Sequence, residues 1–294
     1  MKLIDLIGNT PLVELTSMQD RKEVRIFGKL EGHNPGGSVK DRAAYGMLHG
    51  ALERGEIKHG DRLIEATSGN TGIALAMIAR LLGLEMTLVM PETATEERKQ
   101  TMRAFGADLI LTPGEGTIEY SRTLAQEKAE KEGYHMLNQF ANPDNWKMHY
   151  RTTGPEIWRD TEGEVTHFVS SMGTTGTIMG VSRYLKKKKS DIQIVGTQPT
   201  EGSKIPGIRR WSPEFLPEIF EADRVDRTID VSEKQAAEMA RRLAREQAVF
   251  SGMSSGGACT AALKVASEID RGCIVFIVCD RGDRYLSSSL FSLT

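Results

Sequence analysis

Residues 62–82 read RLIEATSGNTGIALAMIARLL, and this stretch decides the fold class. It opens with a short aliphatic run over 62–67, which has the length and composition of a buried strand. A polar turn over 67–72 follows, and the residues from there to 82 are apolar at helical spacing. A buried strand, a polar turn and a buried helix are the repeating unit of a parallel α/β sheet. The stretch therefore predicts an α/β fold.

The same alternation of short aliphatic runs and longer segments of helical period continues along the chain. It predicts a mostly parallel, twisted sheet with helices on both faces. The predicted strands cover residues 24–30, 62–67, 86–90, 109–112, 135–140, 167–171, 193–198 and 273–279. The predicted helices cover residues 39–54, 72–82, 96–105, 118–131, 155–161, 177–188, 233–247 and 257–269. No linker rich in Ser, Gly or Pro separates two halves, so any division into domains is spatial.

Composition limits the classes of function. The 294 residues include 39% hydrophobic and 27% charged side chains, a balance that fills a core of roughly two domain lengths. Lys and Arg number 38 and Asp and Glu 40, a net charge of -2 that disfavours nucleic-acid or anionic-membrane binding. The three cysteines show no disulfide or metal pattern, and no apolar run approaches the roughly 18 residues that span a bilayer. We therefore expect a cytoplasmic protein.

Residues 34–42 read NPGGSVKDR and place a lysine, Lys40, in the first turn of a predicted helix. A helix N-terminus carries partial positive charge, which lowers the pKa of a lysine there and favours the neutral amine that attacks a carbonyl. A surface lysine paired with Asp41 is the simpler alternative. This segment alone favours that alternative.

Two further loops join a predicted strand to a predicted helix. Residues 67–72, TSGNTG, bring hydroxyls, an amide and backbone N–H groups to a helix N-terminus, where they suit a small carboxylate. An ordinary capped turn explains these residues equally well. Residues 170–178, SSMGTTGTI, combine threonine hydroxyls with glycines that let an anion approach the backbone. This loop predicts a phosphate site, although it lacks the Gly-Lys-Ser/Thr of a nucleotide-binding P-loop.

Two more polar loops, 252–257 (GMSSGG) and 279–285 (CDRGDRY), complete the set. We place all five at the carboxyl ends of presumed parallel strands, where ligands bind, and expect one shared pocket. The proline-rich segment 199–217 predicts a long loop and contains Arg209-Arg210-Trp211. The six histidines lack zinc-ligand spacing, so no metal site is predicted.

Together these motifs resemble those of the fold-type II pyridoxal-phosphate enzymes, and among them the cysteine synthases (O-acetylserine sulfhydrylases) of the B type. The resemblance runs from Ile7 to Ser287. It implies two three-layer α/β domains with mostly parallel twisted sheets, like those of the tryptophan synthase β chain, with pyridoxal 5'-phosphate in the cleft between them. It also implies a smaller mobile domain of residues 35–145, a larger cofactor-binding domain of residues 1–34 and 146–294, and a homodimer.

The resemblance assigns a role to each loop. Lys40 matches the lysine that forms a Schiff base with the cofactor and later moves the substrate α-proton. The other implied cofactor contacts are Asn70 at the 3'-oxygen, Ser254 at the pyridine nitrogen, and Gly173, Thr174, Thr175, Gly176 and Thr177 at the phosphate. The implied substrate contacts are Thr67, Ser68, Thr71 and Gln139 at the carboxylate, and Arg209, Arg210 and Trp211 at the entrance used by the sulfur donor.

The implied reaction is a β-replacement. O-acetyl-L-serine loses acetate to leave an α-aminoacrylate, and sulfide or thiosulfate adds to give L-cysteine or S-sulfocysteine. A cystathionine β-synthase or a serine/threonine dehydratase shares the fold, but the arginine–tryptophan loop favours the synthase. A regulator that only binds an amino acid or a phosphate has no need of Lys40. Product analysis with sulfide, thiosulfate and homocysteine separates the first two alternatives.

Overall fold

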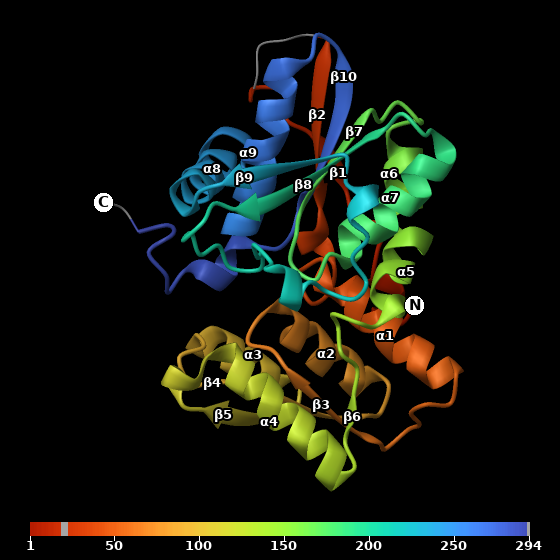
Figure 1. The fold of residues 1–294 in the computed structure, drawn as a ribbon, viewed down its shortest axis with the longest axis vertical. Coiled ribbons are helices and arrows are strands. Elements are labelled where there is room, and N and C mark those ends of the chain that lie inside the picture. Colours follow the sequence, from red (N-terminus) through yellow and green to blue (C-terminus); the bar gives the residue numbers. More distant parts are fainter. Residues whose placement is uncertain (19–22, 293–294) are drawn as a thin grey trace.

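The computed structural model describes residues 1–18 and 23–292, and its strands form two sheets, one above the other in Figure 1. The upper sheet has six strands in the order β1-β2-β10-β7-β8-β9. Its edge strand β1 is antiparallel to β2, and the other described pairs in it are parallel. These strands are β1 (Leu12–Glu14), β2 (Val24–Leu30), β7 (His167–Ser171), β8 (Gln193–Pro199), β9 (Arg227–Val231) and β10 (Gly272–Val278).

The lower sheet has four parallel strands in the order β5-β4-β3-β6. They are β3 (Arg62–Ala66), β4 (Glu85–Pro91), β5 (Asp108–Thr112) and β6 (His135–Met136). The α-helices are α1 (Lys40–Glu53), α2 (Asn70–Leu81), α3 (Glu96–Ala104), α4 (Thr117–Glu132), α5 (Pro143–Arg151), α6 (Thr153–Asp160), α7 (Gly176–Lys188), α8 (Glu233–Gln247) and α9 (Met253–Glu268).

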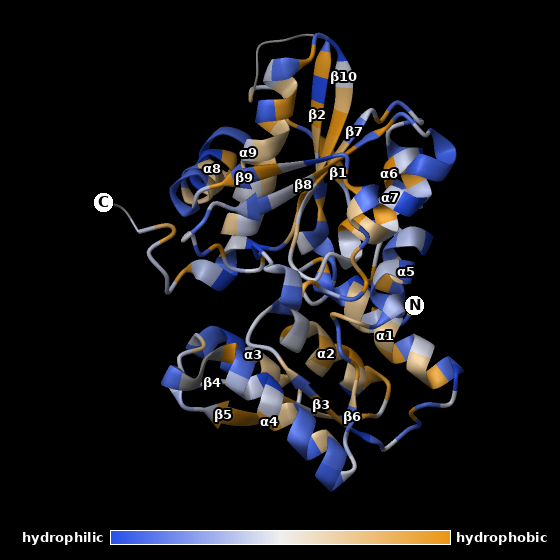
Figure 2. Cartoon of the chain, viewed as in Figure 1, coloured by the Kyte–Doolittle hydropathy of each residue, from blue (hydrophilic) through white to orange (hydrophobic). Residues whose placement is uncertain are grey.

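Both faces of each sheet are covered, which explains the apolar strands. In β10, Ile274 and Phe276 pack in the core beneath α8 and α9, whereas Val275 and Ile277 pack in the core beneath α6 and α7. An interior parallel strand buried on both sides has no solvent face, so it reads as a continuous apolar run. The hydropathy colouring in Figure 2 shows this pattern, with hydrophobic strands inside and hydrophilic residues on the outer helix surfaces.

The predicted α/β class is confirmed, and most predicted elements lie within one or two residues of the observed ones. Five differences stand out. The strand predicted at 135–140 ends at Met136, because Asn138 takes a left-handed conformation with φ 51° that breaks the extended backbone. The edge strands β1 and β9 and the whole of α5 were not predicted.

The fifth difference is the start of α9, which begins at Met253 rather than at 257. Two helices meet closely there. A Cβ on Gly256 would lie 2.1 Å from the backbone oxygen of Ala236 on α8. The glycines of residues 252–257 therefore serve helix packing as well as the loop, and this loop follows α8 rather than a strand.

The chain path brings the carboxyl ends of the strands together. The loops after β3 and β6 in the lower sheet, and those after β7 and β10 in the upper sheet, all border one cavity. Within the described ranges, none of the helices has the length and apolar character needed to cross a membrane.

Candidate active site

The cavity between the two sheets has a volume of about 560 Å³. Residues from all five polar loops line it, so the predicted single pocket is confirmed. The predicted site residues that line it are Lys40, Thr67, Ser68, Asn70, Thr71, Gln139, Gly173, Thr174, Thr177, Arg209, Arg210, Trp211 and Ser254. The predicted Thr175 and Gly176 are the two that do not line it.

Lys40 is the first residue of α1, and its backbone N–H donates to the hydroxyl of Ser38 at 3.2 Å. Its side chain is partly buried and lines the cavity. Burial lowers the pKa of its amine, against the opposing charges of Cys279 and Asp280. The direction agrees with the sequence prediction, although desolvation is the main cause rather than the helix N-terminus. The neutral amine is the form that attacks a carbonyl.

The alternative in which Lys40 pairs with Asp41 is wrong. Asp41 is fully buried and accepts a hydrogen bond from the backbone N–H of Gly36. Burial raises the pKa of this carboxyl to about 7. Lys40 forms no ion pair with any residue in the described part of the chain, so its amine is available to a ligand.

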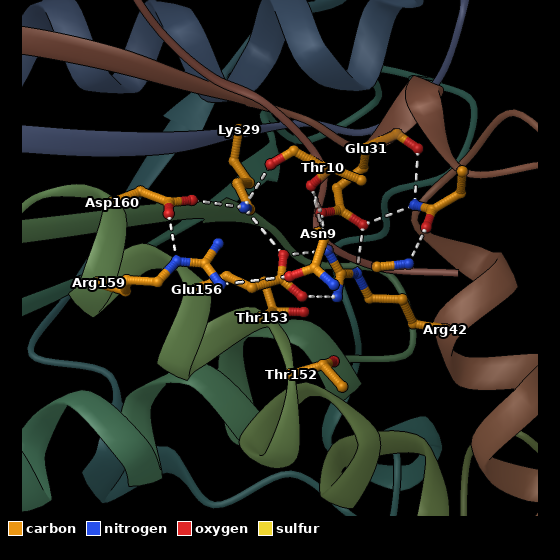
Figure 3. Close-up of polar contacts among 12 residues, drawn as sticks. Asn9, Thr10, Lys29, Glu31, Arg42, Thr152, Thr153, Glu156, Arg159 and Asp160 are labelled. Atoms are coloured by element: carbon orange, nitrogen blue, oxygen red, sulfur yellow. Dashed lines mark hydrogen bonds and ion pairs between the residues drawn. The ribbon is translucent and has the colours of Figure 1, made fainter. Parts of the chain in front are cut away.

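A buried ionic network fixes the start of α1 (Figure 3). The guanidinium of Arg42, two residues after Lys40, lies between two carboxylates that come from other elements. Its Nε donates to Glu31 Oε2 at 2.7 Å, and its Nη1 donates to Glu156 Oε1 at 2.6 Å. Glu31 lies in the short helix η2 (Glu31–His33) that follows β2, and Glu156 lies on α6. The network therefore holds the helix that carries Lys40 against the body of the upper sheet.

Lys29 on β2 extends this network. Its Nζ lies 2.9 Å from Glu156 Oε2 and 3.2 Å from Asp160 Oδ2, and it donates to the backbone oxygen of Thr10 at 2.7 Å. Burial alone would raise the pKa of Glu156, but the hydrogen bonds and charges of Arg42 and Lys29 lower it to about 2. The carboxylates are thus held in the ionised form that the cations require.

The 67–72 loop contacts residues that follow β10 of the upper sheet, on the other side of the cavity. Asn70 opens α2, and its Nδ2 donates to Asp280 Oδ2 at 2.7 Å, while its Oδ1 accepts from Arg284. Asp280 also accepts from the hydroxyl of Tyr285 at 2.7 Å. An amide nitrogen carries two hydrogens, so Asn70 retains one N–H for a ligand. On the other side of the loop, the hydroxyl of Thr71 donates to Gln139 Oε1 at 2.9 Å.

The 170–178 loop turns into α7 at Thr175, which has φ 69°. Its hydroxyl is buried and has no hydrogen-bond partner among the residues that the structure describes. Gly173 is required for a close approach, because a Cβ there would lie 2.4 Å from the backbone oxygen of Gly207. The hydroxyl of Thr174 accepts from Asn145 Nδ2 at 3.2 Å. Hydroxyls and backbone N–H groups at a helix N-terminus form a site for an anion.

The long loop at 199–217 covers the cavity mouth. The indole N–H of Trp211 donates to the backbone oxygen of Gly173 at 2.8 Å, and the ring meets Phe140 edge to face. Arg210 is paired with Asp230, whereas Arg209 is exposed and pairs with no acidic residue in the described ranges. Both arginines line the cavity.

Residues 3–280 match the family model described as "Pyridoxal-phosphate dependent enzyme". This chain belongs to that family. It is 56% identical over 290 residues to cysteine synthase B of Pseudomonas aeruginosa, covering 98% of this chain and 97% of that one. The crystal structure of a cysteine synthase from Entamoeba histolytica matches 100% of this chain and 91% of its own, with TM-score 0.94 and 39% identity. An O-ureido-L-serine synthase structure matches 98% and 94%, with TM-score 0.93 and 36% identity.

The cofactor of this family is pyridoxal phosphate, and the cavity residues fit it. A phosphate bound in the 170–178 loop would meet Gly173 and the hydroxyl-bearing Thr174 and Thr177, which line the cavity where α7 begins. An aldehyde needs a neutral amine, which the lowered pKa of Lys40 favours. Ser254, at the first turn of α9, brings a neutral hydroxyl to the same cavity.

Thr177→Val should therefore weaken the binding of pyridoxal phosphate about tenfold, the cost of one lost hydrogen bond to a charged group. The isosteric valine keeps the packing, so the melting temperature of the cofactor-free protein should change little. Titration of the cofactor-free protein with pyridoxal phosphate, followed by absorbance, measures the dissociation constant. An unchanged dissociation constant would show that the hydroxyl has no part in the phosphate site.

Several residues that shape this site were not predicted. Asn145 joins the phosphate loop to Gln139, since its Nδ2 also donates to the backbone oxygen of Gln139 at 2.8 Å. Asp280 and Arg284 hold Asn70. His149 is buried, its pKa is lowered to about 3 by burial and by the charge of Arg42, and it contacts Thr177 at 3.3 Å. The loop 279–285 was singled out, but no residue type or spacing linked it to Asn70.

Proposed function

We propose that this chain is a cysteine synthase of the B type, which converts O-acetyl-L-serine and a sulfur donor into L-cysteine or its S-sulfo derivative and acetate. The observation that carries the proposal is the partly buried amine of Lys40, aimed into a cavity whose two sides offer a carboxylate site and a phosphate site. The 56% identity to a cysteine synthase B, against 36% to the O-ureido-L-serine synthase, supports the choice among β-replacement enzymes.

Each loop has a task in the proposed reaction. Pyridoxal phosphate, when bound, supplies the carbonyl that takes the substrate amino group and the ring that accepts the electrons of the α-carbon. Lys40 holds the cofactor, removes the α-proton at its Nζ and later returns a proton. Thr67, Ser68, Thr71 and Gln139 bind the substrate carboxylate. The ionic contacts of Arg42 with Glu31 and Glu156 fix the start of α1 and so hold the amine of Lys40 at one place in the cavity.

Asn70 and Ser254 tune the cofactor in this proposal. Asn70 would hold the 3'-oxygen of the cofactor with its free N–H, and Ser254 would offer a neutral hydroxyl to the pyridine nitrogen. A neutral hydroxyl would not keep that nitrogen protonated as an aspartate would, and this environment would favour elimination of a good leaving group such as acetate over side reactions.

The domain division is a further part of this proposal. Residues 35–145 form the smaller domain, which moves toward residues 1–34 and 146–294 when substrate binds, with the start of α1, paired with Glu31 and Glu156, as its fixed end. In the closed arrangement, the contacts of Asn70 with Asp280 and Arg284 join the two bodies across the cavity. Closure excludes water from the reacting carbon. A homodimer in the cytoplasm remains the proposed assembly and location.

Reduction with borohydride tests the function most directly. The protein with bound pyridoxal phosphate should lose its visible absorbance, and peptide mass spectrometry should place the reduced adduct on Lys40. Cysteine formation from O-acetylserine and sulfide, compared with the products from homocysteine, separates a cysteine synthase from a cystathionine β-synthase. Release of an oxo acid from serine or threonine instead would identify a dehydratase and overturn the proposal.

Arg210→Ala should lower kcat/KM for thiosulfate about tenfold while changing kcat/KM for sulfide little. The reason is the guanidinium at the cavity mouth, which attracts a dianion more strongly than the smaller sulfide donor. Initial rates with each donor at saturating O-acetylserine measure the effect. The matched control is Arg224→Ala. Arg224 is also a salt-bridged arginine, and it lies in the short helix η5 (Ala222–Arg224). Equal losses of kcat/KM with both donors would show that the Arg209-Arg210-Trp211 segment has a purely structural role.

A further inference from the structure

Glu65 is a buried carboxylate in the lower sheet that the proposed reaction does not use. It is the penultimate residue of β3 and only 2% exposed. Its partner in register on β4 is Leu88, an apolar residue. A charged group buried at such a place has a large desolvation cost unless other groups compensate it.

The compensation comes from the backbone of the next chain segment. Glu65 Oε2 accepts a hydrogen bond from the N–H of Asn138 at 3.1 Å. The backbone N–H groups of Leu137 and Ala66 also act on the carboxylate, as does the charge of Arg122 on α4. Asn138 is the residue with φ 51° at which the chain leaves the sheet after β6. Glu65 thus holds the turn where strand pairing stops.

The residue after this turn is Gln139. It is buried, its side-chain oxygen accepts from the Thr71 hydroxyl at 2.9 Å, and its backbone oxygen accepts from Asn145 at 2.8 Å. The other side of the substrate-carboxylate site, Thr67 and Ser68, begins two residues after Glu65, directly after the end of β3 at Ala66. The carboxylate of Glu65 therefore lies where the two segments that line the substrate-carboxylate site meet.

We propose that Glu65 is a positioning residue that, as the anion, holds Asn138 in its turn and so aligns Gln139 with the Thr67–Thr71 side of the substrate-carboxylate site. This inference rests on the proposed function, because it concerns the binding of a substrate carboxylate. Glu65 acts through the backbone of Asn138 and does not itself touch substrate.

The ionisation of Glu65 makes the proposal testable. Burial raises its pKa to about 7, against the lowering effect of the three backbone N–H groups and Arg122. The group is therefore mostly protonated below that pH and mostly ionised above it. An ionised acceptor forms stronger hydrogen bonds with N–H donors than a protonated one does. The alignment of Gln139 should thus improve as the pH rises through about 7.

Acetate is a suitable probe because it carries a carboxylate that does not titrate in this range. For the protein with bound pyridoxal phosphate, we expect acetate to bind about fivefold more tightly at about pH 8 than at about pH 6. In Glu65→Gln, whose side chain does not ionise, this pH dependence should disappear, and binding at the higher pH should be weaker than in the parent. Fluorescence of the bound cofactor reports the binding.

The matched control is Glu85→Gln, the same change at the exposed first residue of β4, which should keep the pH dependence of the parent. The inference is overturned if Glu65→Gln keeps that pH dependence. It is also overturned if the parent binds acetate more weakly as the pH rises, which is the result that charge repulsion from an ionised Glu65 would give. If Glu65→Gln does not fold, the parent titration still decides, because a flat profile also overturns the inference. Borohydride labelling of Lys40 is independent of all these outcomes, so failure here is distinguishable from failure of the proposed function.

Discussion

Lys40→Ala is expected to lower kcat/KM for O-acetylserine at least about a thousandfold, because it removes the amine that, in the proposed reaction, both holds the cofactor and moves the α-proton. Sulfide-dependent formation of cysteine measures the loss. Lys187→Ala, at an exposed position in the last turn of α7, is the matched control and should retain parental activity. If Lys40→Ala kept activity comparable to that of the control, the assignment of the cofactor lysine would be wrong.

The stability of the variant separates lost chemistry from lost folding. The folded-state pKa of Lys40 is lowered by burial, so the folded protein binds its proton less well than the unfolded chain does. By linkage, this lysine destabilises the fold at pH values below its unfolded pKa, and the penalty disappears only above it. The cofactor-free Lys40→Ala protein should therefore melt no lower than the cofactor-free parent near neutral pH.

Much of the fold follows from local pattern. The strand at 167–171 and the helix at 233–247 match the prediction residue for residue, because their periodicity is strong and their ends carry clear signals. Ser232 shows this, since its hydroxyl accepts from the N–H of Gln235 in a capping box. The carboxyl-edge rule then places the loops that follow β3, β7 and β10 at one cavity, whereas the 252–257 loop follows α8 and reaches the cavity by helix packing.

The missed elements lack such signals. The strands β1 and β9 lie at the sheet edges and are partly exposed, so their sequences are not continuously apolar. Helix α5 begins with Asn142 as N-cap and Pro143 at its first turn, a start signal that is easily taken for a loop. The helix is polar along much of its length, and only its packing between α1 and α7 shows its role.

The site shows the same division between local and long-range information. Loop composition predicted a phosphate site and a carboxylate site, but the side chains that hold these loops in place come from distant segments. Arg42 and Glu156 are 114 positions apart, and Asn70 and Asp280 are 210 positions apart. No spacing rule connects such pairs, because the fold alone decides which buried charges meet.

Arg42→Met is expected to lower the free energy of unfolding by about 3–5 kcal/mol, because it leaves the buried carboxylates of Glu31 and Glu156 without their main cation. Methionine fills similar space, so a cavity contributes little. Chemical denaturation of the cofactor-free protein measures the change. Arg242→Met removes an exposed (i, i+4) partner of Glu246 on α8 and is the matched control, with a much smaller effect.

The pH dependence of this loss identifies its cause. In the parent, the pKa of Glu156 is lowered to about 2, so its stabilising contribution is present above its ordinary value of 4.5 and is lost as the pH falls toward 2. In Arg42→Met, burial raises the pKa of Glu31, and the cost of ionising it grows as the pH rises. The difference in unfolding free energy between parent and variant should therefore be largest near neutral pH and shrink as the pH falls below about 5. A difference that stayed constant with pH would indicate lost packing rather than uncompensated charge.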